Sequence, residues 1–234
     1  MRRPLANLLS LSRKPSVSLA RDGAAVVRGF LDRDAASELK ATVEELFTAI
    51  AKYASFTSDT MAHHYTARQA IWLGELPAFL DVNSRALLPR YTALMDRITD
   101  RTQALFGDDW QPYPSRSFIR RMNAELRLPW HLDADAAKLD YPECCNVWLP
   151  LDSVGMSRPS LELIVGSHHK LRASVKQKDA PALVASLGRP WAPRLHLGDA
   201  LVVDQFTYHR SQIVEDGGAA RTSCEFRYYR NVKP

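Results

Sequence analysis

The sequence contains few cysteines, no long apolar run and no excess of charge outside its first residues. Only three of its 234 residues are cysteine, and two of them, Cys144 and Cys145, are adjacent. This set cannot form the even, spaced disulfide framework of a small secreted domain, so we expect a reducing compartment and buried thiols. No stretch of about eighteen apolar residues is present, which argues against a membrane-spanning helix.

The net charge of +5 belongs to the N-terminus. Five basic residues precede the first acidic residue, Asp22, and the remaining 26 basic residues are balanced by 26 acidic ones. A neutral body disfavours nucleic-acid binding, because phosphate recognition requires Lys and Arg gathered on one face. We therefore predict a basic arm over residues 1–21 and a single domain over residues 22–234.

The composition of this arm allows two interpretations. It is rich in Arg and Ser and has no acidic residue, as organelle transit peptides do. We favour the arm of a bacterial, cytoplasmic protein and keep organelle import as the alternative. A secretory signal is disfavoured because Arg13 and Lys14 interrupt the apolar run.

Hydrophobic periodicity predicts helices in the first half and strands in the second. A strand over 24–30 precedes a helix capped by Asp32 or Asp34, and a second helix spans 84–106, whereas residues 54–78 lack a period and are interpreted as a surface or lid segment. Short strand-like runs follow, at 115–122, 145–152, 161–166, 194–198, 200–206 and 223–230. We expect an α+β, mainly β fold, with helical support over 22–113 and a β core over 114–234. Neither a βαβ alternation nor a glycine-rich phosphate loop is present, which argues against dinucleotide and P-loop folds.

The segment Trp130-His131-Leu132-Asp133 is the sharpest chemical feature. In an extended chain, residues two apart point to the same side, so His131 and Asp133 can converge. A further histidine, His209, follows a strand-like run 78 residues later. Two imidazoles and one carboxylate, with other coordination positions open, form the facial triad of non-haem Fe(II) oxygenases. The sequence predicts His131, Asp133 and His209 as metal ligands and catalytic residues.

Arg221 and Ser223 follow His209 in one strand register. A guanidinium binds a carboxylate with two parallel hydrogen bonds, and a serine hydroxyl can donate to the same group. These two residues are therefore expected to bind the distal carboxylate of 2-oxoglutarate.

From residue 115 to the C-terminus the sequence resembles the phytanoyl-CoA dioxygenase-like family of Fe(II)/2-oxoglutarate-dependent oxygenases. The segment WHLDAD resembles the metal-binding Trp-His-x-Asp segment of that family. LELIVGSHH resembles its Pro-Gly-Ser-His turn, with Val165 where proline is usual. GDALVVDQFTYHRSQ is similar to the strand leading to the distal histidine, and RTSCEFRY to the strand with the cosubstrate arginine. Several such segments in the right order are more specific than any one of them.

The resemblance implies a double-stranded β-helix with N-terminal helices supporting one sheet. It implies an oxidoreductase in which Fe(II), 2-oxoglutarate and O2 hydroxylate an unactivated C–H bond of a small molecule, with release of succinate and CO2. We expect a substrate from secondary or amino-acid-type metabolism, with an acidic or carrier-bound molecule as one possibility. Related halogenases lack the carboxylate, so Asp133 favours hydroxylation. Asn146 is expected to face inward in this register, where it either binds 2-oxoglutarate or is satisfied by neighbouring backbone.

Several other polar residues can be interpreted either as structural or solvated residues or as functional ones. Asp135 could replace Asp133 as a ligand, but we favour a position at the pocket mouth. His168 and His169 are adjacent and are expected to serve the Gly166-Ser167 turn. His63 and His64 lie in the expected lid, as solvated residues or substrate contacts. Arg227 is one of several arginines that could bind an acidic substrate.

Two other function classes compete with the oxygenase. One is a non-catalytic, cupin-like module that binds a ligand and holds a structural metal; Arg221 and Ser223 argue against it. The other is a metal-assisted hydrolase, which lacks a clearly placed general base.

Overall fold

The computed structural model describes residues 19–53, 69–122, 126–136, 139, 143–173, 175–214 and 218–230. Among these residues the main feature is an antiparallel sheet of seven strands in the order β1-β7-β5-β9-β4-β2, with β3 paired to β9. The strands are β1 (Ala24–Val27), β2 (Ala70–Trp72), β3 (Gln111–Pro112), β4 (Phe118–Met122), β5 (Glu143–Pro150), β7 (Ala200–Asp204) and β9 (Arg221–Arg230).

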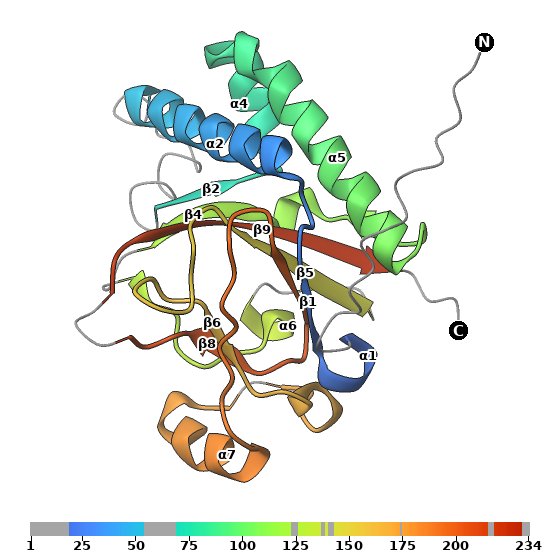
Figure 1. Ribbon diagram of the computed structural model, residues 1–234, viewed down its shortest axis with the longest axis vertical. Helices are drawn as coiled ribbons and strands as arrows, with labels where there is room; N and C mark the ends of the chain where they lie inside the picture. The colour runs from blue at the N-terminus through green and yellow to red at the C-terminus, as the bar shows by residue number, and fades with distance from the viewer. Residues whose placement is uncertain are drawn as a thin grey trace.

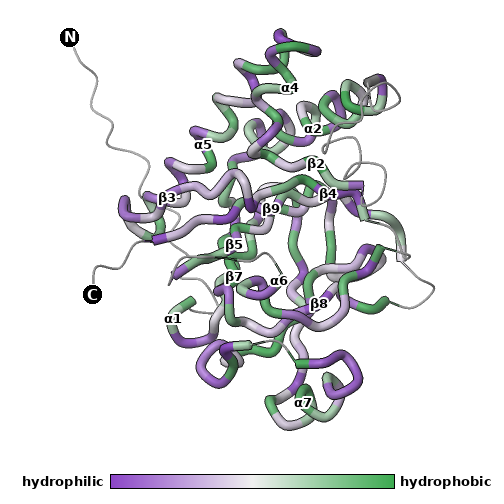
Figure 2. Tube along the Cα trace, turned by 180° about the vertical axis from the view of Figure 1, so that it is seen from behind, coloured by the Kyte–Doolittle hydropathy of each residue, from purple (hydrophilic) through white to green (hydrophobic). Residues whose placement is uncertain are grey.

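Three helices cover one face of this sheet, namely α2 (Arg33–Tyr53), α4 (Leu76–Asn83) and α5 (Leu88–Phe106) (Figure 1). The Asp32 carboxylate caps α2 by accepting the backbone N–H of Ala35 at 2.8 Å. Green and purple alternate along α2 and α5 in Figure 2, as expected for helices that bury one face and expose the other. The buried face of α2 consists of the apolar residues that recur every three or four positions: Leu39, Val43, Leu46, Phe47 and Ile50.

A small second sheet faces the other side of the large one. It pairs β6 (Leu161–Leu163) with β8 (His209–Ser211), and isolated bridges such as His131 to His209 extend it. Figure 1 shows β6, β8 and the short helix α6 (Asp133–Ala136) opposite the helical layer, with α7 (Ala180–Leu187) beyond them. The remaining short elements are α1 (Leu19–Asp22), η1 (Arg85–Leu87), η2 (Pro114–Arg116), η4 (Ser167–His169) and η5 (Gln177–Asp179).

Successive side chains of β9 belong to different layers. Cys224, Phe226 and Tyr228 lie in the apolar core beneath the helices. Arg221, Ser223, Glu225 and Arg227 alternate with them, are all at most 7% exposed and lie on the opposite face. The large sheet therefore separates an apolar core from an interior that holds buried charges.

The predicted fold class, a mainly β α+β protein with helices supporting one sheet, is confirmed. The three cysteines are free and buried, as expected. Among the described residues, no helix has the length and apolar character needed to cross a bilayer.

Several element boundaries differ from the predictions. Residues 70–78 are not a surface lid: they form β2, which pairs Ile71 with Ile119 of β4, and the start of α4. Residues 54–68 lie outside the described residues. The helix expected over 84–106 begins at Leu88 after a separate 3-10 turn, because Pro89 has no N–H to donate and is tolerated in the first helical turn. The run 194–198 contributes only an isolated bridge through Leu195.

The helical layer should carry much of the folding free energy. We expect Leu46→Ala, at a position 1% exposed, to lower the free energy of unfolding by about 2–5 kcal/mol because it opens a cavity between α2 and the sheet. Leu105→Ala in α5, where the side chain is 42% exposed, is the matched control and should change it by less than about 1 kcal/mol. Urea denaturation of both variants makes the comparison; equal losses would contradict the assigned packing.

Candidate metal centre and cosubstrate pocket

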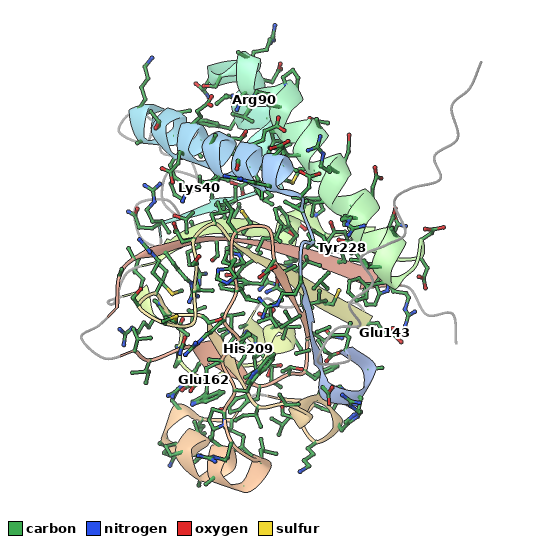
Figure 3. The ribbon with its side chains drawn as sticks, viewed as in Figure 1. Lys40, Arg90, Glu143, Glu162, His209 and Tyr228 are labelled. Carbon is green, nitrogen blue, oxygen red and sulfur yellow. The ribbon has the colours of Figure 1, made fainter. Side chains whose placement is uncertain are left out.

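The structure brings His131, Asp133 and His209 together, and their ligand atoms all lie within 4.8 Å of one another. His131 and His209 pair through two backbone hydrogen bonds of 2.9 and 3.1 Å, so their rings stand side by side with centroids 4.2 Å apart. Asp133 is the first residue of α6 rather than part of a strand. His209 opens β8 rather than ending the preceding strand. Figure 3 shows His209 on the side of the large sheet away from the helices.

Both imidazoles are oriented by backbone carbonyls. Nδ1 of His131 lies 2.8 Å from the Pro129 carbonyl oxygen, and Nδ1 of His209 lies 2.8 Å from that of Thr207. Because a carbonyl only accepts, each Nδ1 donates its proton to that carbonyl, so Nε2 is the ring atom that can face a metal. The two Nε2 atoms lie 3.8 and 3.9 Å from Oδ1 of Asp133. Three donor atoms thus face one point.

Burial and charge put His131 and Asp133 in the protonation states that a metal requires. Burial, together with the neighbouring His209, lowers the pKa of His131 to about 4, so its ring is neutral at physiological pH. Burial alone would raise the pKa of Asp133, but Arg227 and the two histidines outweigh it and hold that pKa well below its usual range. A neutral His131 imidazole and an ionised Asp133 carboxylate, with the His209 imidazole beside them, form a donor set that fits Fe(II).

Other predicted polar residues lie elsewhere. Asp135 is exposed, and Asp133 is the carboxylate beside the histidines. The rings of His168 and His169 bond to the carbonyl oxygens of Ala20 and Arg21 in α1, at 3.2 and 3.1 Å, so they connect η4 to α1. His63 and His64 lie outside the described residues.

Arg221 is buried in the interior that the metal-site residues also line. Its Nη1 donates to the carbonyl oxygens of Pro159 and Ser160, the latter at 2.8 Å, and its guanidinium lies over Trp148, 5.0 Å from the ring centroid. Burial lowers the pKa of Arg221 to about 10, which leaves it charged at neutral pH. The carbonyls and the ring fix the guanidinium without supplying a carboxylate to neutralise it.

Polar atoms without partners gather around Arg221. Among the described residues, no hydrogen-bond partner exists for Nε of Arg221 or for the buried hydroxyls of Ser223 and Ser160. The same is true of Trp148 Nε1. The amide oxygen of Asn146 also has no partner among these residues, but it is an acceptor and lies near Asp133 and Arg227 rather than Arg221. Buried polar groups are rarely left unpaired, because each costs about 1–3 kcal/mol. An anionic, oxygen-rich ligand such as 2-oxoglutarate fits this lining.

The role of Arg227 was not predicted from the sequence. This side chain is 3% exposed, and its Nη2 donates to Oδ1 of Asp133 at 2.9 Å, so it is engaged inside the protein. Asn146 donates from Nδ2 to Oδ2 of the same carboxylate at 3.3 Å. The only available signal was the register of β9, which places Arg227 on the same face as Arg221 and Ser223.

The contacts that support His209 extend to Gly23, in the N-terminal segment. Thr207, whose carbonyl oxygen orients the His209 ring, donates from Oγ1 to the Gly23 carbonyl oxygen at 2.7 Å. Gly23 has φ +73°, and a Cβ there would lie 2.2 Å from Oγ1 of Thr207. Only glycine fits this contact between the N-terminal segment and the strand that carries His209.

Comparisons with known proteins agree with this geometry. A profile of the family described as phytanoyl-CoA dioxygenase (PhyH) matches residues 19–214. No curated protein matches the sequence significantly.

Solved structures show the same fold at low sequence identity. AviO1 from Streptomyces viridochromogenes Tue57 is 20% identical, with a TM-score of 0.65 over 92% of this chain and 93% of AviO1. EctD from S. alaskensis, described with 2-oxoglutarate and 5-hydroxyectoine, is 19% identical, with a TM-score of 0.65 over 98% of this chain and 83% of EctD. SnoN, described as an epimerase in complex with Fe3+, alpha ketoglutarate and nogalamycin RO, is 16% identical, with a TM-score of 0.60 over 91% and 80% of the two chains.

The contact at Gly23 yields a test of the support for His209. We expect Gly23→Ala to displace Thr207 and weaken divalent-metal binding by roughly 10- to 100-fold, because outer-shell partners fix the ligand ring. Gly29→Ala is the matched control, since Gly29 also has a positive φ (+59°) but no atom within 4 Å of the added Cβ. Titration with Co(II) under anaerobic conditions measures both affinities. Equal affinities in the two variants would refute the coupling.

Proposed function

Because the chain belongs to the phytanoyl-CoA dioxygenase family, as its sequence predicted, we propose that it hydroxylates an unactivated C–H bond of a small-molecule metabolite. The predicted enzyme class, a 2-oxoglutarate-dependent oxygenase with iron, 2-oxoglutarate and O2 as its cofactors, is confirmed. The observation that carries the proposal is the buried cluster of His131, Asp133 and His209, with both Nε2 atoms aimed at one carboxylate oxygen.

In this proposal each group has a role that follows from its contacts. His131, Asp133 and His209 hold the iron, which supplies the oxidising chemistry when bound with the cosubstrate and O2. Arg221 and Ser223 bind the distal carboxylate of 2-oxoglutarate, and the unpartnered carbonyl oxygen of Asn146 faces the same interior. The apolar and aromatic lining around Trp148 excludes water, which strengthens these charged contacts.

The donor set supports hydroxylation over halogenation. Asp133 supplies the carboxylate, so the site offers no extra position for a halide. A small-molecule substrate is supported by EctD and SnoN, which are described with 5-hydroxyectoine and nogalamycin RO.

Access to the metal is proposed from the side of His131. Its side chain is 16% exposed, compared with 5% for Asp133 and 3% for His209. The substrate C–H bond and O2 would approach over this ring, while 2-oxoglutarate occupies the closed side near Arg221.

The first test concerns the metal site itself. Anaerobic Fe(II) plus 2-oxoglutarate should give the protein a weak visible charge-transfer band, and His131→Ala should abolish it because one of the three ligands is lost. His196→Ala, at an exposed histidine, is the control and should keep the band.

The reaction is then followed as O2-dependent succinate formation, with a panel of CoA thioesters, amino acids, carrier-bound acyl groups and terpenoids as substrates. Folded, metal-loaded protein that gives neither band nor succinate would favour the cupin-like binding module instead.

The second test concerns the cosubstrate. Arg221→Met should weaken 2-oxoglutarate binding to the metal-loaded protein by about 10- to 100-fold, because it removes charged hydrogen bonds to a carboxylate. Metal affinity should remain unchanged. Arg158→Met, at a partly exposed arginine that donates to the Ala220 carbonyl oxygen, is the matched control. Isothermal titration calorimetry separates the two affinities, and equal 2-oxoglutarate binding in both variants would reassign the cosubstrate site.

A further inference from the structure

The carboxylate of Asp133 is held from both sides. Its Oδ1 accepts a hydrogen bond from Nη2 of Arg227 at 2.9 Å, and its Oδ2 accepts one from Nδ2 of Asn146 at 3.3 Å. The donors come from neighbouring positions of β9 and β5, where Asn146 and Arg227 are register partners. The rotation of the carboxylate is therefore set by the large sheet and not by α6, on which Asp133 resides.

The guanidinium of Arg227 is itself immobilised. Its Nη1 donates to the Arg116 carbonyl oxygen, and its central carbon lies 5.1 Å from the centroid of the Phe118 ring. The carboxylate of Glu225 lies 3.5 Å from Nη2 and offsets part of the charge. Arg227 is 3% exposed, so these contacts are largely desolvated and strong.

The oxygen that Arg227 holds is the one that faces both histidines. Oδ1 of Asp133 lies 3.8 and 3.9 Å from the Nε2 atoms of His131 and His209, whereas Oδ2 is held by Asn146. We propose that Arg227 is a positioning residue that fixes Asp133 so that a single oxygen, Oδ1, is presented to the iron. A carboxylate bound through one oxygen leaves more coordination positions for 2-oxoglutarate and O2 than one bound through two.

This inference rests on the proposed function, and a merely structural role of the ion pair makes a different prediction. If Arg227 only neutralises a buried carboxylate, it contributes to folding stability, and its loss leaves the metal affinity of the folded protein unchanged. If Arg227 orients Asp133, it contributes to metal affinity even when the net charge of the interior is preserved.

The test therefore uses a charge-matched double variant. Arg227→Met with Glu225→Gln removes one positive and one negative charge from the interior. We expect Co(II) to bind this folded variant about tenfold more weakly, because outer-shell partners that orient a ligand have effects of that size. The absorption band of the Fe(II) and 2-oxoglutarate complex should also shift in energy, because the carboxylate is free to rotate. Arg230→Met with Glu143→Gln is the matched control: it removes an ion pair between the same two residue types at a partly exposed position of β9 and β5.

Each outcome decides between the two roles. Co(II) affinity within twofold of the unmodified protein, together with an unshifted band, overturns the inference, whatever the change in urea stability. Arg227→Lys keeps the buried charge but not the planar fork, and it carries the test if the double variant does not fold. Its Co(II) affinity should fall at least about threefold, and an unchanged affinity overturns the inference. Failure of the unmodified protein to bind Co(II) and 2-oxoglutarate would instead refute the proposed function.

Discussion

A buried, ionised carboxylate imposes the constraint on which the rest of the site depends. Asp133 is 3% exposed, and an unpaired charge at such a position would cost several kcal/mol. The protein meets this cost by pairing the carboxylate with the guanidinium of Arg227 and the amide N–H of Asn146. Arg227 in particular keeps the pKa of Asp133 low, while burial and the neighbouring His209 lower the pKa of His131 and keep its ring neutral. The requirement for burial and the requirement for metal binding are thus met by one arrangement.

The large sheet makes this arrangement possible because one of its faces is apolar and packs on the helices, while the other holds buried charged residues. Arg221, Ser223, Glu225 and Arg227 of β9 place charged and hydroxyl groups in the interior, while Phe226 and Tyr228 pack against the helical layer on the opposite face. Successive side chains of a strand point to opposite faces, so Arg221 and Arg227 lie on the same face of the sheet at two positions along β9. Packing of α2 and α5 on the apolar face holds the polar face in register. The same strands therefore contribute to the folding stability and to the geometry of the site.

The sequence was informative where function depends on a short motif or a strict period. His131 and Asp133, separated by one residue, and the alternating Arg221 and Ser223 were identified because these patterns place side chains on one side of an extended chain. The local geometry was nevertheless different, since Asp133 begins a short helix and converges with His131 only because of the turn into α6. The strand β2 was missed because three residues, Ala70 to Trp72, are too few to show a period and are defined by pairing with β4.

Contacts that join distant segments had no signal in the sequence. Arg227 was recognised only as one of several arginines, because its contact with Asp133 spans 94 residues and depends on the register between β5 and β9. The same holds for Gly23, whose carbonyl oxygen lies 184 residues from Thr207 in sequence.

These two long-range contacts have a common physical basis. His209 and Asp133 each contribute one atom to the centre, and a contact with a distant segment of the chain helps to fix the rotation of that group. Thr207 and Gly23 do so for His209, and Arg227 does so for Asp133. A motif identifies which residues can bind a metal, but it does not encode the long-range hydrogen bonds that help to orient them. The surrounding fold determines the orientation in which they bind it.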